Sequence, residues 1–390
     1  MGHLLQVWDG HRYVPARPRL YAGGGWTSGT RTRPDDGVVL RSPFAPYLAE
    51  GTVFTRKVAD MPLATRSADY AAWMATSSPW KPGGAWGART SLNTRTYNIP
   101  IHLVDSRLHG LRQVHMTCRG VDGAGAAYVN GLVPWPSWAQ PAPGGDRSIA
   151  IYDLGTGIMR EFFLCEQVDD DAWTAASGGY YLARPDLTGL ATTNDAMQLT
   201  QGSSSVVRML NPLSQIGITE ARNGLIRHAV SVTMANAAVP TSTAEGLSSS
   251  GRRVPVTGAS WPAQSGDGDT DGDVAPIHGQ WFRLPSGIDL SAYRPFTRLV
   301  IAACQTYGGY GADTNNWCHA FNAEPGVLET HLYGVDPWSP AGDVHARYAK
   351  ACRREGYAES LALDVSDFPW ELTEWAPRDW GRPATPVNRM

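Results

Sequence analysis

The sequence predicts a mainly β fold with a few short helices. The 390 residues include 42 Gly and 28 Pro, which punctuate turns, and 15 Trp, which carry large amphipathic contact areas. Several short segments also alternate apolar and polar residues, which is the period of a half-buried strand. The length fits either roughly two to three domains or one large all-β domain with appendages. Such a chain can bury a core without disulfide or metal staples.

Helix N-caps, glycines at helix ends and apolar periodicity predict where the individual helices and strands begin and end. Ser67 and Asp343 have N-cap side chains, whereas Gly308 and Gly356 follow the ends of helical patterns. The expected helices cover residues 68–76, 295–306 and 344–355. The expected strands cover residues 96–105, 113–118, 126–129, 148–153, 159–166, 179–183 and 225–235, with extended chain at 313–321. Residues 236–260 are rich in Ser, Gly, Ala and Pro and are expected to form a long mobile insert.

The N-terminus contains a short repeat. Residues 7–13 are echoed by residues 20–26, and each copy predicts a small hairpin with a glycine turn, of which Asp9-Gly10 is the stronger signal. Hairpins of this size are marginal alone, so the pair needs a surface to pack on. The repeat is either a docking element or an edge extension of the main sheet.

The chain divides into four expected parts. Residues 1–30 hold the repeat, 31–95 form an irregular linker with one short helix, and 96–335 form the β body. Residues 336–390 hold a helix and a Trp/Pro-rich C-terminal arm, which packs on a partner or back on the body.

Charge and cysteine content limit the function classes. The net charge of −3 gives no basic footprint for nucleic acid. Five cysteines without a Cys-x-x-Cys pair predict buried free thiols made in a reducing compartment. Neither a signal peptide nor an apolar run long enough to span a membrane is expected.

The most informative stretch covers residues 134–166. It begins with Trp135 and Trp138 among prolines and continues as a hairpin around Gly155-Thr156-Gly157. Period-two spacing predicts that one apolar face of the hairpin carries both Asp153 and Glu161 near the turn. A tryptophan wall beside inward carboxylates indicates a carbohydrate-facing groove. The alternative is a hairpin with solvated acids and tryptophans in the core.

Two further segments contain candidate site residues. His228 falls on the apolar face of its predicted strand, so it is either a hydrogen-bonded core residue or a binding or acid–base group. Asp267, Asp269, Asp271 and Asp273 match the first half of a calcium loop, and no other cofactor is expected. Position 12 of that loop is His278 and not Glu, so an acidic surface loop is the alternative to a Ca²⁺ site.

The order of several motifs resembles the minor tail proteins of phages that infect Actinobacteria. The pieces are the aromatic-glycine hairpins, IPIHLVDS, LVPWPSWA, SIAIYDLGTGIMREFF, GITEARNGLIRHAVSV, the acidic DGDTDGD region and RLVIAACQTYGGYGADTNNW, which together cover roughly residues 96–325 after the hairpins. The resemblance implies a two-layer antiparallel β-sandwich of jelly-roll or concanavalin-like type in a tail tip or baseplate. The matching positions are Asp105, Asp153, His228 and Asp313, without an established catalytic role.

Three functions remain open. A structural and adsorption protein of the virion would be assembled in the host cytoplasm and bind other tail or baseplate proteins. It would be a homo-oligomer, with a trimer preferred. It would also bind a host cell-envelope glycan, with Trp135, Trp138 and Trp173 stacking on sugar rings.

The second function is a polysaccharide-degrading enzyme, which needs two carboxyl groups close together, such as Asp153 and Glu161. The chain contains no Gly-x-Ser-x-Gly, His-Glu-x-x-His or phosphate-loop motif, which disfavours other hydrolase classes. The third function is a purely structural hub. Solvent-facing Trp135 and Trp138 would favour binding, and tryptophans buried at a protein interface would favour the hub.

Overall fold

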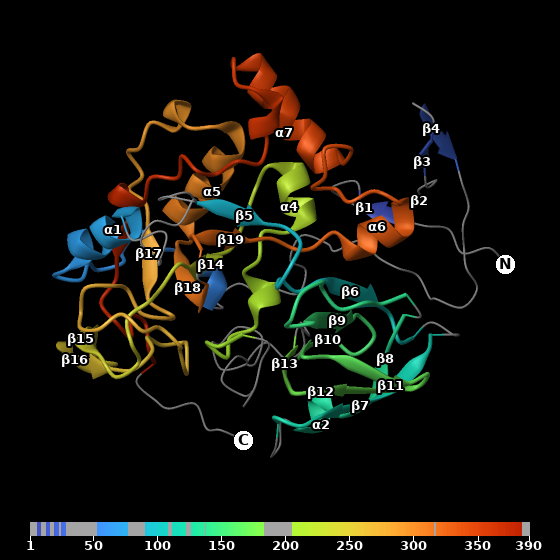
Figure 1. Ribbon diagram of the computed structural model, residues 1–390, viewed down its shortest axis with the longest axis horizontal. Helices are drawn as coiled ribbons and strands as arrows, with labels where there is room; N and C mark the ends of the chain where they lie inside the picture. Colours follow the sequence, from blue (N-terminus) through green and yellow to red (C-terminus); the bar gives the residue numbers. More distant parts are fainter. Residues whose placement is uncertain are drawn as a thin grey trace.

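A computed structural model describes residues 53–76, 90–107, 111–121, 126–136, 138–182, 205–315 and 317–383, and the backbone of four short strands between residues 6 and 28. The described chain is rich in β-strands, which pair in several sheets, with fewer helices (Figure 1). This confirms the β-rich class that the composition predicts. Among the described residues, none of the helices has the length and apolarity that crossing a membrane requires.

The N-terminal repeat forms two separate antiparallel hairpins. Strand β1 (Gln6–Trp8) pairs with β2 (Tyr13–Pro15), and β3 (Arg19–Ala22) pairs with β4 (Gly25–Ser28). The hairpins predicted from the repeat are therefore confirmed, whereas their docking role stays a prediction.

Residues 101–182 form two four-stranded sheets. Their strands are β6 (Ile101–Val104), β7 (Gln113–Cys118), β8 (Gly131–Pro134), β9 (Ile149–Asp153), β10 (Ile158–Phe163), β11 (Glu166–Asp169), β12 (Ala172–Ala175) and β13 (Ser177–Leu182). The central sheet has the order β13-β10-β9-β6, and the outer sheet has the order β11-β12-β7-β8. Because β6 runs parallel to β9 and β7 runs parallel to β12, both sheets are mixed and not antiparallel as expected.

A third, six-stranded sheet collects segments from most of the described chain. Its strands are β5 (Ser91–Asn93), β14 (Val230–Met234), β17 (Trp281–Arg283), β18 (Gly309–Thr314), β19 (Ala320–Asn322) and β20 (Glu374–Trp375). Their order is β20-β17-β18-β14-β19-β5, and the neighbours β14 and β18 are parallel. The carboxyl ends of β14 and β18 therefore meet at one edge, which is where open sheets usually bind ligands.

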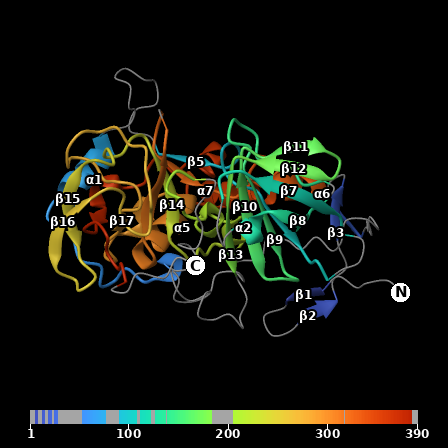
Figure 2. The ribbon, with the colours of Figure 1, turned by 90° about the horizontal axis from the view of Figure 1, so that it is seen from below.

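The central sheet is buried on both faces. Ile149 and Ile151 of β9 belong to a cluster shared with the outer sheet, whereas Ala150 and Tyr152 belong to a cluster shared with Tyr310 of β18. Because both faces of β9 are buried, its residues 149–152 are apolar without alternation. The central sheet thus lies between the outer sheet and the six-stranded sheet, as the view in Figure 2 shows.

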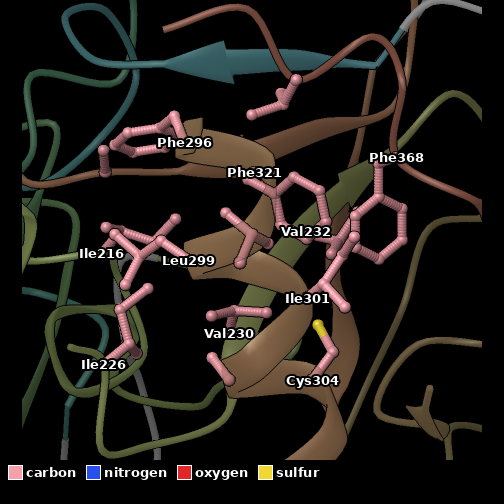
Figure 3. Packing of buried hydrophobic residues seen from close by; sticks show 14 of the residues in the cluster. Ile216, Ile226, Val230, Val232, Phe296, Leu299, Ile301, Cys304, Phe321 and Phe368 are labelled. Atoms are coloured by element: carbon pink, nitrogen blue, oxygen red, sulfur yellow. The ribbon is translucent and has the colours of Figure 1, made fainter. Parts of the chain in front are cut away.

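Helices cover the other face of the six-stranded sheet. These helices are α1 (Ser67–Thr76), α4 (Ile218–Asn223), α5 (Pro295–Thr306) and α7 (Asp343–Arg354). Helix α2 (Ala126–Val129) packs instead in the cluster of the outer sheet, and α6 (Val327–Tyr333) carries His331, which stacks on Trp138. Figure 3 shows Leu299 of α5 packing toward Val230 and Val232 of β14 and Phe321 of β19. Helix α5 has the bounds that the sequence predicts, because its proline start is a local signal.

The end of the chain packs back on the body. Trp370 exposes 2% of its surface and Trp375 exposes none, and both belong to the same core cluster as α5. Strand β20 also completes one edge of the six-stranded sheet. Up to residue 383, the expected extended arm is therefore an integral part of the core.

Three local predictions are wrong. Residues Ala126–Val129 form helix α2 and not a strand, because a four-residue apolar segment does not separate the two periods. The strand expected from residue 225 begins only at Val230, after the chain turns His228 toward helix α4. Residues 236–260, expected to be a long mobile insert without strands, contain a paired hairpin of β15 (Thr243–Leu247) and β16 (Arg253–Thr257).

Candidate functional site

The tryptophans proposed to contact sugars are core residues. Trp135 and Trp173 expose 1% and 6% of their surfaces, and their ring centroids lie 4.7 Å apart. Trp138 exposes 7% and stacks on His331 at a centroid distance of 4.8 Å. Rings buried in this way present no face to a ligand. The expected solvent-facing tryptophan strip is therefore wrong, and the alternative of core tryptophans holds.

Asp153 and Glu161 do not form a carboxylate pair. In the antiparallel register, Glu161 lies opposite Ala150, whose face points toward the six-stranded sheet, whereas Asp153 shares the opposite face with Ile151. The Asp153 carboxylate instead accepts hydrogen bonds from the N–H groups of Ser106 and Gly155, both at 2.9 Å. Asp153 therefore holds the turns beside it.

Asp105 and His228 also make structural contacts. The Asp105 carboxylate accepts hydrogen bonds from the Arg107 side chain and N–H, and the side-chain bonds from Arg107 hold the pKa of Asp105 below its usual value. His228 is 3% exposed, with Nδ1 at 2.8 Å from the Ala229 carbonyl oxygen and Nε2 at 2.9 Å from Glu220 Oε2. Both neighbours present oxygen atoms that can accept a hydrogen bond, so the protonated ring can donate from both nitrogens. Burial works against that charge, but the Glu220 carboxylate outweighs it and raises the pKa of His228.

The acidic loop does not wrap around a single point. Asp269 accepts a hydrogen bond from Asn236, and Asp273 accepts one from Tyr70. Asp271 is exposed, and Asp267 turns toward Thr314 of β18. Within the described residues, His, Cys, Asp and Glu side chains form no group of three that could hold a metal ion. The calcium loop predicted from spacing is therefore not assembled, although Ca²⁺ binding itself stays a prediction.

Two of the sequence-predicted residues do meet, at the end of strand β18. The Thr314 hydroxyl donates to Asp267 Oδ1 at 2.8 Å, and the preceding residue is Asp313. A register shift between β14 and β18 lies next to Asp313 and changes the course of the strand there. A third carboxyl, Asp146 from the loop before β9, lies within electrostatic reach of Asp313. We name Asp146, Asp267 and Asp313 the acidic cluster.

The three carboxyl groups of the acidic cluster have different proton affinities. The pKa of Asp313 is raised to about 7, chiefly because the group is buried; the hydrogen bond from the Thr314 N–H lowers it, and the charges of Asp267 and Asp146 raise it. Burial also raises the pKa of Asp146. In contrast, the side-chain contact with His278 and the Thr314 hydroxyl lower the pKa of Asp267. Neighbouring acids with opposite shifts are typical of functional sites.

Asp313 has one oxygen available. Among the described residues, its only hydrogen bond is the one that Oδ1 accepts from the N–H of Thr314, at 2.8 Å. The Asp146 side chain likewise has no hydrogen-bond partner among these residues; its backbone oxygen accepts the Leu164 N–H. Partly buried carboxyl groups without partners are costly to the fold, so their presence needs an explanation.

His278 is fully buried behind Asp267. Its Nε2 lies 3.3 Å from Asp267 Oδ1, but the approach lacks hydrogen-bond geometry, and neither ring nitrogen makes a hydrogen bond to any residue that the structure describes. Gly266 makes room for the ring, because a Cβ at that position would lie 2.5 Å from Nδ1 of His278. A buried imidazole is thus aimed at the acidic cluster without a hydrogen-bonding partner.

Two exposed aromatic side chains belong to segments that adjoin Asp313 and Asp146. Trp317, three residues beyond Thr314, is 50% exposed, and Tyr97 is 58% exposed. The Tyr97 ring lies against Gly144, two residues before Asp146, and Tyr97 has a φ of +64°, which is unusual for an aromatic residue. Strained backbone of this kind is often kept at functional sites.

Sequence reasoning identified Asp267 and Asp313 but missed Asp146, His278, Tyr97 and Trp317. Two glycines were the available local signals. Gly144, two residues before Asp146, makes room for the Tyr97 ring, and Gly266, next to Asp267, makes room for the His278 ring.

In comparisons with known proteins, no family model, curated protein or solved structure matches this chain.

Proposed function

We propose that this chain is a minor tail protein of a phage that infects Actinobacteria, and that it binds a host-surface glycan at the acidic cluster. The order of motifs over roughly residues 96–325 supports the tail assignment. Five cysteines without a disulfide suit assembly in the reducing host cytoplasm before incorporation into the virion. The hairpins of residues 1–30 would contact other tail proteins, in a homo-oligomer of the chain.

The fold fits this proposal. Val114 and Met116 of the outer sheet share one buried cluster with Ile149 and Ile151 of the central sheet. We assign these two sheets to the lectin-like sandwich that the resemblance implies, with the six-stranded sheet and its helices as an addition that supplies Asp267 and Asp313.

The chemistry of the acidic cluster carries the glycan proposal. With a pKa of about 7, Asp313 is protonated in much of the protein at neutral pH, so it can both donate and accept a hydrogen bond. Sugar hydroxyls also do both. The exposed rings of Tyr97 and Trp317 add apolar surface on which a sugar ring can stack. The negative cluster would repel uronic or phosphorylated sugars, so a neutral or amino sugar is the expected ligand.

A binding experiment tests this proposal. We expect the purified chain to bind a glycan array and whole actinobacterial cells, and a Tyr97→Ala/Trp317→Ala variant to lose about tenfold or more in affinity. Leu132→Ala is the matched control, because Leu132 is an apolar side chain that is 68% exposed on β8, an edge strand of the outer sheet. Equal binding by the double variant would remove the proposed site, and no binding by the wild type to cells or array would remove the function.

A further inference from the structure

Arg56 has a guanidinium group with buried nitrogens and no acidic partner among the described residues. It follows η1 (Val53–Thr55), whose Val53 and Phe54 side chains belong to the buried cluster that the central and six-stranded sheets share. Burial lowers the pKa of Arg56 to about 9, and no carboxylate in the described part of the chain opposes that effect. The guanidinium is therefore still charged at neutral pH, in surroundings that leave its charge unpaired.

Three tryptophans surround this guanidinium. Its Cζ lies 3.4 Å from the ring centroid of Trp380, 5.5 Å from that of Trp281 and 5.9 Å from that of Trp261. The backbone also approaches closely at Gly381, which has a φ of +79° and where a Cβ would overlap Nη1 of Arg56. Contacts between a cation and ring faces hold the guanidinium in one place.

The ring contacts leave one edge of the guanidinium without an acceptor. Stacking uses the face of the group, whereas its N–H bonds lie in its plane. Nη1 donates to the Trp380 carbonyl oxygen at 3.3 Å, but Nε and Nη2 are buried and have no hydrogen-bond partner among the described residues. These two nitrogens form the edge of an arginine that can bind two oxygens of one anion.

Trp261 supplies a third donor of the same kind. Its backbone N–H is fixed by a hydrogen bond of 2.7 Å to Asp379 Oδ1, but its indole Nε1 is buried and has no partner in the described part of the chain. A buried indole N–H usually has an acceptor. Since a hydrogen bond spans about 2.7–3.2 Å, one anion can reach donors on both side chains across the 5.9 Å between the Arg56 Cζ and the Trp261 ring centroid.

We propose that Arg56 and Trp261 form a binding site for a phosphate group. A phosphate presents at least three acceptor oxygens, so it can satisfy the Arg56 edge and the indole N–H together. A carboxylate has two oxygens and would leave the indole N–H unpaired once it bound the edge. Lys57 is exposed, with its Nζ 3.9 Å from the Tyr307 ring centroid, and adds a second positive charge next to Arg56 in the chain.

The Trp380 ring covers the site. Because Nε and Nη2 of Arg56 have almost no exposed surface, a ligand reaches them only when this cover moves. Trp380 is only partly buried, whereas the preceding residue, Asp379, is anchored through its N–H to the Ser260 hydroxyl at 2.9 Å. The ring can therefore turn aside while the backbone before it stays in place. None of these residues belongs to the acidic cluster, so phosphate binding can be tested separately from glycan binding.

Calorimetry of the full chain with inorganic phosphate tests the site. Arg56→Met keeps an apolar side chain among the rings but removes the donors, and Trp261→Phe keeps an aromatic ring but removes the indole N–H. Phosphate also stabilises proteins in general, so the difference between wild type and variant is the quantity that counts. At about ten times the dissociation constant, we expect phosphate to raise the melting temperature of the wild type by about 1–3 °C more than that of either variant.

The matched control is Arg252→Met, which removes an exposed arginine and changes the net charge equally. Its melting temperature should respond to phosphate as the wild type does. Sodium chloride at the same ionic strength replaces phosphate in a parallel series. Glucose 1-phosphate, added in a third series, distinguishes a phosphate carried by a sugar from free phosphate, because only a site that accepts the substituted group binds both.

Nuclear magnetic resonance gives a readout that a merely structural Arg56 would not change. The indole N–H signal of Trp261 is assigned by its absence in Trp261→Phe. We expect this signal to move with added phosphate until the site is saturated, and to stay in place in Arg56→Met. If Arg56→Met does not fold, the signal in the wild type and the calorimetry of Trp261→Phe still decide.

Equal stabilisation of the wild type and the folded variants, with an unmoved Trp261 signal, would overturn the site and leave Arg56 as a packing residue. Stabilisation that Trp261→Phe retains in full would overturn the part assigned to the indole N–H. A saturable response of the wild type that both variants lose would support the phosphate site, whether or not glucose 1-phosphate also binds.

Discussion

Replacing Asp313 by Asn should stabilise the protein at alkaline pH and have little effect in acid. The pKa of Asp313 in the folded protein is about 7, against an ordinary value of 3.8. Between these values the folded state binds more protons than the unfolded state, so stability falls as the pH rises from about 4 to about 7. Above that range, the folded protein carries the full cost of a partly buried carboxylate, which the neutral amide avoids.

The size of the effect follows from the shift. The difference between 7 and 3.8 is about 3 pKa units, which at about 1.36 kcal/mol per unit gives at most about 4 kcal/mol. The Asn side chain keeps an oxygen that can accept the N–H of Thr314, so the one observed hydrogen bond is not lost. We therefore expect the free energy of unfolding to rise by about 1–4 kcal/mol near pH 8 and by little near pH 4.

Equilibrium urea unfolding of the wild type and of Asp313→Asn at both pH values measures this difference. Asp271→Asn changes the net charge equally but removes an exposed carboxylate, so it should alter stability by less than about 0.5 kcal/mol. A gain for Asp313→Asn that is absent near pH 8, or equal at both pH values, would contradict a buried acid with a raised pKa.

Three other predictions follow from described contacts. Trp135→Ala should lower the free energy of unfolding by about 3–5 kcal/mol, because the ring is buried against Trp173. The protein that remains folded should still bind glycan. Loss of binding without loss of stability would instead support a glycan-binding groove at the tryptophans. In the wild type, the free energy of unfolding should fall as the pH rises above about 6.5, because the raised pKa of His228 favours the folded state only while the ring is protonated. His228→Gln should make this fall smaller. An unchanged pH dependence in urea unfolding would refute a protonated His228. If the loop that contains Asp267 binds Ca²⁺, millimolar Ca²⁺ should raise the melting temperature. Calorimetry measures this shift, with Mg²⁺ as the control, and no shift with Ca²⁺ would rule out the calcium site.

The acidic cluster could not have been found by reading the sequence. Asp146, Asp267 and Asp313 come from a loop before β9, an acidic loop and the end of β18, and the three segments meet only because the six-stranded sheet packs on the central sheet. The spacing of the acidic loop suggested a cation site, because spacing gives the order of the carboxylates but not their directions. In the folded protein, Asp269 and Asp273 turn to other partners.

The sequence also could not predict which face of the sheet each carboxylate of the β9–β10 hairpin occupies. Periodicity correctly gave the apolar positions of β9 and β10, but the faces of Asp153 and Glu161 depend on the register between the two strands. A shift of one residue moves a side chain to the other face of a sheet, and nothing within either strand specifies that register. The prediction of a shared carboxylate face therefore failed, although both strands were found.

The sequence by itself determined the features that depend on neighbours along the chain. The β-rich class, the two N-terminal hairpins, strand Gln113–Cys118 and helix Pro295–Thr306 follow from turns, periodicity and proline geometry, which act over a few residues. Only the tertiary structure decided that the tryptophans are buried and that the acidic cluster assembles. Burial and proton affinity depend on which surfaces pack together, and that packing joins segments that are far apart in the chain.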